Sequence, residues 1–261
     1  MGGAILGKCD LYNTPGMAAG YANSRPAVHE RILEMVRQRL RLTRRLDWAL
    51  DVGCGAGLST RLLQRIARHC IGIDPSEAML GWSSRVAPNA CFAAGAAEAL
   101  PVRSHSIDII TAAGSLNYAD LNLFFPEAAR VLAPGGVLVI YDFSEGRNFR
   151  GSASLDTWYS EFLRRYPPPS GSGRQISPAS LGSLDSGFRL SGHEYFEIGL
   201  TLNPDSYLDY VMTETNVAHA VGNGVSEQEI RAWCAGTLEL VFQGEARDVL
   251  FPGYTAYLVV A

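Results

Sequence analysis

Apolar residues in the first half of the chain fall into short continuous runs, separated by stretches with helical spacing. The runs cover residues 48–52, 70–73, 90–94, 106–112 and 137–141. Runs of this length are typical of strands buried on both faces of a sheet. Between them, apolar residues recur every three or four positions, which predicts helices. Because strands alternate with helices, we predict an α/β fold with a doubly wound, parallel sheet.

The second half of the chain is less regular. Alternating apolar residues over 195–202 and 254–260 predict two more strands, which makes a mostly parallel, seven-stranded sheet. Helical spacing predicts two helices between these strands, over 205–220 and 226–240, and the second opens with a Ser226-x-x-Glu229 capping box. We interpret these helices as a cap over the carboxyl edge of the sheet. A proline- and glycine-rich stretch just before them predicts an exposed loop.

Charge and composition limit the partners. The chain has 261 residues, with 22 basic and 26 acidic side chains and a formal net charge of −4. No run of Lys or Arg is longer than a dipeptide, so we expect no nucleic-acid partner. Five widely spaced cysteines and five histidines without ligand spacing predict neither a disulfide framework nor a metal site. No apolar run suits a signal peptide or a membrane span, so we expect a soluble, cytoplasmic protein with no membrane partner.

A glycine-rich motif carries the main chemical signal. Residues 50–57 read LDVGCGAG and lie between a predicted strand and a predicted helix. Glycines in such a loop let the backbone turn tightly and let a ligand approach the main chain. The dinucleotide fingerprint needs a small residue where this chain has Leu58, which disfavours NAD. Asp74 ends the second predicted strand, where a carboxylate can accept hydrogen bonds from both hydroxyls of a ribose.

Four motifs in this order resemble a known family. LDVGCGAG, GIDPSEAML, AAEALPVRSHSIDIITAAGSLNY and EAARVLAPGGVLVIYDF are similar to the core of class I S-adenosylmethionine-dependent methyltransferases, closest to their small-molecule "type 11" branch. The resemblance covers about Tyr21 to Phe143. It implies a Rossmann-like methyltransferase fold, S-adenosyl-L-methionine as cofactor and S-adenosyl-L-homocysteine as product.

The resemblance also implies which residues bind the cofactor. The glycine loop would line the methionine part, with Asp51 holding the loop and orienting the amino group, and Asp74 would bind the ribose. The implied contacts are with Tyr21, Arg25, Asp51, Gly53, Cys54, Gly55, Gly57, Asp74, Pro75, Met79, Ala97, Glu98, Ala113 and Gly114.

The chain departs from the family pattern at one implied contact. Many relatives carry an acidic residue at the position of Ala96, where it accepts from the adenine amine. The segment from Tyr21 to Pro26 resembles a Y-x-x-x-R-P entry segment found in part of the same branch. Arg25 would then reach the cofactor's carboxylate, and Tyr21 would close over the transfer site. From the sequence, Arg25 could equally well be an exposed surface residue. Met79 could equally well be a core residue.

We predict a single methyltransferase domain over residues 1–261. Its parts are an amino-terminal helix over 24–46, a cofactor-binding core over 47–144, cap insertions over 145–193 and 203–248, and a last strand over 254–260.

The chemistry predicted from these motifs is methyl transfer to an O, N, S or C nucleophile of a small-molecule acceptor. A sulfonium is already an activated methyl donor, so the protein needs mainly to align the reactants and exclude water. An acceptor hydroxyl or ammonium would also need a base, for which His219, Tyr141 and Asp142 are candidates. The alternatives are an NAD-dependent oxidoreductase and a cofactor-binding module without catalysis. We expect a monomer or a homodimer.

Overall fold

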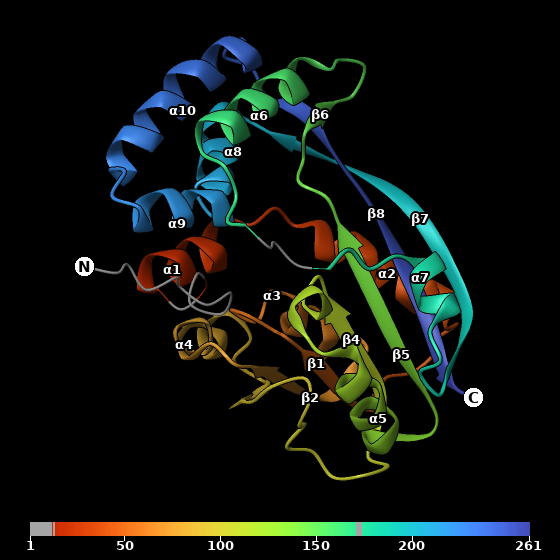
Figure 1. The fold of residues 1–261 in the computed structure, drawn as a ribbon. Helices are drawn as coiled ribbons and strands as arrows, with labels where there is room; N and C mark the ends of the chain where they lie inside the picture. The colour runs from red at the N-terminus through yellow and green to blue at the C-terminus, as the bar shows by residue number, and fades with distance from the viewer. Residues whose placement is uncertain (1–11, 13, 171–173) are drawn as a thin grey trace. The chain divides into compact units, whose positions relative to one another are not determined.

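The computed structural model describes residues 12, 14–170 and 174–261, which form two compact units (Figure 1). The sheet unit contains His29–Phe143, residues 174–196 and Gly253–Ala261. The helical unit contains the described residues up to Val28, residues 144–170 and Glu197–Pro252. Each unit is therefore assembled from three separate segments of the chain. That the two act as one methyltransferase domain stays a prediction.

The sheet unit is built on five parallel strands. They are β1 (Leu46–Val52), β2 (Ala67–Asp74), β3 (Cys91–Ala94), β4 (Ile107–Ala113) and β5 (Leu132–Phe143), in the spatial order β3-β2-β1-β4-β5. β8 (Arg247–Val260) pairs with β5 in antiparallel register, from Leu138 opposite Leu258 to Phe143 opposite Gly253. β7 (Phe188–Leu202) pairs with β8. The predicted doubly wound, mostly parallel sheet is confirmed.

The described residues form eight strands rather than the seven predicted. The addition is β6 (Asn148–Phe149), which pairs with β8 within the helical unit. Two residues are too short a stretch for a hydrophobic pattern to reveal. β7 and β8 are longer than their predicted ranges, because pairing with a neighbouring strand extends them into residues that do not alternate.

The register places the ends of three strands at one edge of the sheet. Val52, the last residue of β1, lies opposite Ile73 of β2 and opposite Ala112 of β4. The next residues are Gly53, which follows β1, and Asp74 and Ala113, which end β2 and β4, so the three lie at the same edge of the sheet. Ligands bind at this edge in open α/β sheets.

The helices of the sheet unit include those that the spacing predicts and two that it did not predict. The predicted ones are α2 (Val28–Arg39), α3 (Leu58–Leu63), α4 (Glu77–Val86) and α5 (Leu121–Val131), and the other two are the 3-10 helix Leu116–Tyr118 and α7 (Pro178–Ser183). Ser76 and Asp120 cap α4 and α5, since each side chain accepts a hydrogen bond from a first-turn amide.

The helical unit has an aromatic core. Its helices are α1 (Pro15–Ser24), α6 (Ser154–Arg165), α8 (Pro204–Val211), α9 (Thr215–Gly222) and α10 (Glu227–Phe242). Trp158 stacks on Phe162 and Trp233, with ring centroids 5.2 and 5.8 Å apart. The Trp158 indole donates to Thr237 Oγ1 at 2.8 Å. Buried rings with a satisfied polar atom of this kind give a small unit a large share of its core.

Three helix predictions need correction. The amino-terminal helix predicted over 24–46 is two helices, α1 and α2, because Pro26 holds the preceding Arg25 in an extended conformation. The helix predicted over 205–220 is likewise two, α8 and α9, separated by a turn at 212–214. The Ser226 capping box is wrong: Ser226 is the N-cap of α10, but its side chain makes no capping hydrogen bond.

Two features predicted or noted from the sequence fall partly or wholly outside the described residues. The loop predicted at 166–173 is described only as far as Ser170, and Cys9 lies outside the described residues. Within the described chain, no helix has the length and apolar character that crossing a membrane requires.

Candidate cofactor and acceptor site

The glycine loop after β1 has a backbone that side chains rarely permit. Gly53, Gly55 and Gly57 have φ angles of +69°, +53° and +89°. A Cβ on Gly53 would also overlap the side chain of Ser115, whose hydroxyl donates to the Val52 carbonyl at 2.6 Å. The amides of Gly53 and Cys54 donate to the carbonyl of Ile73, at 2.8 and 3.0 Å. The loop is thereby fixed between β1, β2 and the segment after β4.

Asp51, the residue two positions before Gly53, anchors this loop through hydrogen bonds. Its side chain is fully buried and accepts from three hydroxyls, Ser59 and Thr60 at 2.6 Å and Thr111 at 2.8 Å. Burial raises the pKa of Asp51, and the three hydroxyl hydrogen bonds oppose that shift. Ser59 and Thr60 lie in α3 and Thr111 in β4, so Asp51 ties the loop's helix to the sheet.

Asp74 faces the loop from the end of β2. Its two carboxylate oxygens accept from the amides of Gly55 and Ser76, both at 2.8 Å. Burial raises the pKa of Asp74, and these amide hydrogen bonds oppose that shift. A carboxylate offers about four acceptor positions, so two remain for the two hydroxyls of a ribose. The loop glycines and this acceptor set fit an adenosine-type cofactor.

The other residues implied for the cofactor lie around the same edge of the sheet unit. Pro75 is exposed at the start of α4, whereas Met79 is only 2% exposed and packs in the core. Glu98 accepts from the Asp120 amide at 2.7 Å, and Ala97 packs against the core beside it. Cys54 is buried, and burial raises the pKa of its thiol, as expected for a small packing residue rather than a nucleophile.

Tyr141 and Asp142 leave β5 on opposite faces of the sheet. Tyr141 is buried, and its hydroxyl lies 2.9 Å from Nδ1 of His29 in α2. Asp142 lies on the other face, at the end where β4 runs into Ala113 and Gly114. Its Oδ2 accepts from Asn117 Nδ2 at 3.1 Å, and a Cβ on Gly114 would lie 3.0 Å from its Oδ1. Of the two, Asp142 is the one placed beside a residue implied for the cofactor.

Tyr21 and Arg25 lie together in the helical unit. The Arg25 guanidinium lies over the Tyr21 ring, 4.4 Å from its centroid. It pairs with Glu214 at 3.1 Å and donates to the Thr213 carbonyl at 3.1 Å. Burial lowers the pKa of Arg25, but the charge of Glu214 and the nearby tyrosines raise it by more, so the guanidinium stays charged. The sequence therefore predicted the cation but not the carboxylate that holds it.

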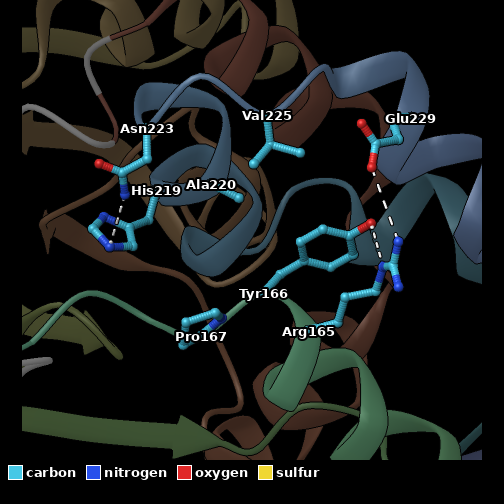
Figure 2. A pocket seen from close by; sticks show the side chains of 8 residues that line it. All are labelled: Arg165, Tyr166, Pro167, His219, Ala220, Asn223, Val225 and Glu229. Carbon is cyan, nitrogen blue, oxygen red and sulfur yellow. Dashed lines mark hydrogen bonds and ion pairs between the residues drawn. The ribbon is translucent and has the colours of Figure 1, made fainter.

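His219 lines a hollow within the helical unit (Figure 2). The hollow has a volume of about 370 Å³ and apolar walls that include Tyr166, Pro167 and Val225. Asn223 Nδ2 lies 3.2 Å from His219 Nε2, and Figure 2 shows the Tyr166 ring between this pair and Arg165. A cavity of this size lies within the range of small-molecule sites. All residues that line the cavity with His219 belong to the helical unit, whereas Asp142 belongs to the sheet unit.

Several residues of these clusters were not predicted from the sequence. They are Ser59, Thr60, Thr111, Ser115, Asn117 and Glu214. Hydroxyls directly after a glycine loop were a usable signal for Ser59 and Thr60. No sequence signal pointed to Asn117 or Glu214, because the residues that they contact are distant in sequence. Among the described residues, no group of three or more His, Cys, Asp or Glu side chains is placed to hold a metal ion.

The central part of this chain is similar in sequence to known proteins. Residues 50–140 match a family model described as a methyltransferase domain. A candidate methyltransferase of Dictyostelium discoideum is 28% identical over 127 residues, which are 49% of this chain and 47% of that protein. The demethylmenaquinone methyltransferase of Mycobacterium marinum is 35% identical over 125 residues, 47% of this chain and 51% of that protein. The chain thus spans about half the length of these relatives.

A solved structure shares the fold. That of a candidate type II methyltransferase from Anaeromyxobacter dehalogenans has a TM-score of 0.67, at 23% identity, over 86% of this chain and 94% of that one. A doubly wound sheet, with its glycine loop after β1 and carboxylate after β2, defines the Rossmann-like class of nucleotide-cofactor proteins. Residues 50–140 of the chain are thus similar to a methyltransferase domain, the same stretch in which the sequence motifs lie.

Proposed function

We propose that this protein is an enzyme that transfers a methyl group from S-adenosylmethionine to a small-molecule acceptor. The observation that carries the proposal is the pairing of the Gly53–Gly57 loop with Asp74, whose carboxylate keeps acceptor positions for two ribose hydroxyls. The net charge of −4 supports a small molecule rather than a nucleic acid as acceptor.

The sheet unit supplies most of the proposed cofactor contacts. When bound, the cofactor supplies a methyl group on a positively charged sulfur, which needs no further activation. The loop amides would face its methionine part, and Asp74 would fix its ribose. Pro75, Ala97 and Glu98 would border the adenine, with Met79 supporting that wall from the core. Ala113 and Gly114 would lie beside the sulfur.

Arg25 is proposed to bind the cofactor's carboxylate. Glu214 and the Thr213 carbonyl hold its two terminal nitrogens. Its Nε is buried and has no hydrogen-bond partner among the described residues. An unpartnered buried donor is costly, and a carboxylate would satisfy it. Tyr21, stacked on the same guanidinium, would hold it in place.

A transfer assay tests the proposed function. Radiolabelled S-adenosylmethionine is incubated with the protein and the fraction of a cell extract below about 3 kDa, and labelled products are separated from the cofactor. We expect label to enter small molecules with the wild type, and Asp74→Ala to abolish transfer. Asp185→Ala, which removes an exposed carboxylate elsewhere in the sheet unit, is the matched control and should leave transfer intact.

Two other results would replace the proposal. Binding of S-adenosylhomocysteine without any transfer would indicate a cofactor-binding module. Binding of NADH, seen as a shift in nicotinamide fluorescence, would indicate an oxidoreductase. Leu58, the first residue of α3, opposes the second, because the dinucleotide fingerprint needs a small residue there.

A further inference from the structure

The carboxylate of Asp142 is held in a defined position at the functional edge of the sheet unit. Oδ1 accepts from the Phe143 amide at 2.9 Å, and Oδ2 accepts from Asn117 Nδ2 at 3.1 Å. The backbone of Gly114, at φ +61°, approaches Oδ1 so closely that a side chain there would crowd it. The carboxylate is therefore fixed beside the residue implied to lie next to the cofactor's sulfur.

Asn117 is itself anchored at both ends. Its carbonyl accepts from the Arg174 amide at 2.9 Å, and its side-chain nitrogen also lies 3.5 Å from the Gly114 carbonyl. The amide group thus bridges the loop after β4 and the end of β5. Loss of this bridge would remove one of the hydrogen bonds that hold the Asp142 carboxylate, without removing any charge.

A third polar group lies beside this pair. Tyr254 of β8 is directly opposite Asp142 of β5, and residues opposite one another in an antiparallel pair point to the same face. Tyr254 is only 8% exposed, and its ring packs in the apolar core of the sheet unit. Its hydroxyl is buried with no hydrogen-bond partner in the described chain. Burial, followed by the charge of Asp142, raises the pKa of Tyr254, so the group stays a neutral donor.

A buried hydroxyl without a hydrogen-bond partner is uncommon and costly. The hydroxyls of Thr255 and Tyr257 in β8 are also without a partner among the described residues, but Tyr254 is the one that lies directly opposite Asp142. Asp142 and Tyr254 together present an acceptor and a donor from directly opposite positions on one face of the β5–β8 pair. This combination is complementary to a group that both donates and accepts hydrogen bonds, such as a hydroxyl or an amine. A thiol or a carbon nucleophile would satisfy neither partner as well.

We infer that Asp142, Asn117 and Tyr254 form an acceptor subsite for a hydroxyl or amine, in which Asp142 removes the proton and Asn117 positions Asp142. The inference rests on the proposed methyl transfer. The acceptor's lone pair forms the new bond to the methyl carbon, while the carbon–sulfur bond breaks and its electron pair stays on sulfur. The proton of the O–H or N–H group passes to the Asp142 carboxylate, so charge and atoms balance.

Three variants and a matched control test the subsite. The assay uses radiolabelled S-adenosylmethionine with the low-mass extract fraction, and tandem mass spectrometry identifies the methylated atom. We expect Asp142→Asn to lower transfer about 100-fold or more, and Asn117→Leu and Tyr254→Phe to lower it about tenfold, the effect of one lost hydrogen bond. In Asn117→Leu the loss should be in kcat, and in Tyr254→Phe it should include a higher KM for the acceptor.

Tyr257→Phe is the matched control. Tyr257 is also a buried tyrosine of β8, three residues further along, but it points to the opposite face of the sheet. Its variant should transfer methyl groups at the wild-type rate. Because the Tyr254 hydroxyl makes no hydrogen bond to any described residue, Tyr254→Phe should unfold at an equal or higher urea concentration than the wild type. A purely structural role would show the reverse, with lower stability and unchanged transfer.

The affinity for S-adenosylhomocysteine separates the two proposals. The three variants and the control should bind S-adenosylhomocysteine within about threefold of the wild type. If they do, while transfer falls in the three variants and not in the control, the subsite acts on the acceptor. Unchanged transfer in Asp142→Asn, label on sulfur or carbon, or a matching loss of cofactor affinity would overturn the subsite while leaving methyl transfer standing. Loss of cofactor binding in the wild type, or binding with no labelled product, would overturn both.

Discussion

At the scale of single residues, three buried carboxylates differ in what surrounds them. Burial raises the pKa of Asp51, Asp74 and Glu214 alike. Asp51 accepts from three hydroxyls, Asp74 from two backbone amides, and Glu214 pairs with Arg25. The partners decide the role: Asp51 holds a loop, Asp74 has positions left for a ligand, and Glu214 fixes a cation.

The first prediction concerns the glycine loop. Gly53 and Gly135 both have strongly positive φ angles, but only Gly53 faces a close neighbour, Ser115. Gly135→Ala should cost about 1–2 kcal/mol of unfolding free energy from the left-handed backbone alone. Gly53→Ala should cost at least about 1 kcal/mol more, because the methyl group overlaps Ser115. Urea unfolding followed by circular dichroism measures both, and equal losses would contradict the packing of Ser115 on the loop.

The second prediction is a pH dependence of cofactor affinity. Only the ionised Asp74 side chain can accept from two ribose hydroxyls while it still accepts from both amides. Its pKa is raised above the ordinary value of 3.8, so the protonated form appears at higher pH than for an exposed aspartate. Affinity for S-adenosylhomocysteine should be constant well above that raised pKa and should weaken as pH falls through it. Calorimetric titrations over a pH series should show this for the wild type, whereas Asp74→Asn should bind weakly at every pH.

At the scale of helices, one ion pair joins two turns of the helical unit. Arg25 follows α1, and Glu214 precedes α9, so the pair fixes the ends of helices that are distant in sequence. Both side chains are largely buried, with 15% and 12% of their surface exposed. A Cβ on Gly20 would lie 3.1 Å from the Thr213 side chain, which shows how closely α1 approaches the same turn.

The third prediction follows from this burial. Glu214→Gln leaves the Arg25 charge buried without its partner, which should lower the unfolding free energy by about 3–5 kcal/mol. The double variant Arg25→Met with Glu214→Leu removes both charges and should be less destabilised than Glu214→Gln. Asp209→Asn, which breaks the exposed pair with Arg231, is the control and should cost less than about 1 kcal/mol. Similar losses of unfolding free energy in Glu214→Gln and Asp209→Asn would show that the buried pair contributes no more to stability than the exposed pair.

The fourth prediction compares two helix starts. Asn203 caps α8 through a full capping box, accepting from the Ser206 amide at 2.8 Å. Ser226 occupies the same position at α10 without a side-chain hydrogen bond. Asn203→Ala should therefore lower the unfolding free energy by about 1 kcal/mol, and Ser226→Ala should have almost no effect. Thermal unfolding measures both losses. A larger loss of stability in Ser226→Ala than in Asn203→Ala would support the Ser226 capping box predicted from the sequence.

At the scale of the whole molecule, the sequence predicted the sheet unit far better than the helical unit. Each parallel strand of the sheet unit is a continuous apolar run, and the glycine loop and Asp74 lie at strand ends, so local pattern was enough. The helical unit is joined from segments up to about 200 residues apart. Its α1 and β6 lack a distinctive period. The buried residues of α6, Leu155, Trp158, Tyr159 and Phe162, do follow helical spacing, so that helix could have been predicted and was not. The buried Arg25–Glu214 pair depends on contacts that no local pattern records.

The candidate site divides in the same way. The proposed cofactor contacts of the sheet unit could be named from the sequence because they follow strands in fixed motifs. Asn117 and Tyr254 were not, because their importance depends on the β5–β8 pairing and on a turn after β4. Asp142 was predicted from its place at a strand end, but only the structure shows the hydrogen bonds that fix its carboxylate.

The most direct test of the account is the affinity of S-adenosylhomocysteine for the wild type, Asp74→Ala and Asp185→Ala, measured by isothermal titration calorimetry. We predict saturable binding to one site in the wild type and an unchanged affinity in Asp185→Ala. Asp74→Ala should bind at least about tenfold more weakly, because the hydrogen bonds to the ribose hydroxyls are lost. No binding by the wild type, or equal binding by Asp74→Ala, would contradict the assignment of the glycine loop and Asp74 as a cofactor site.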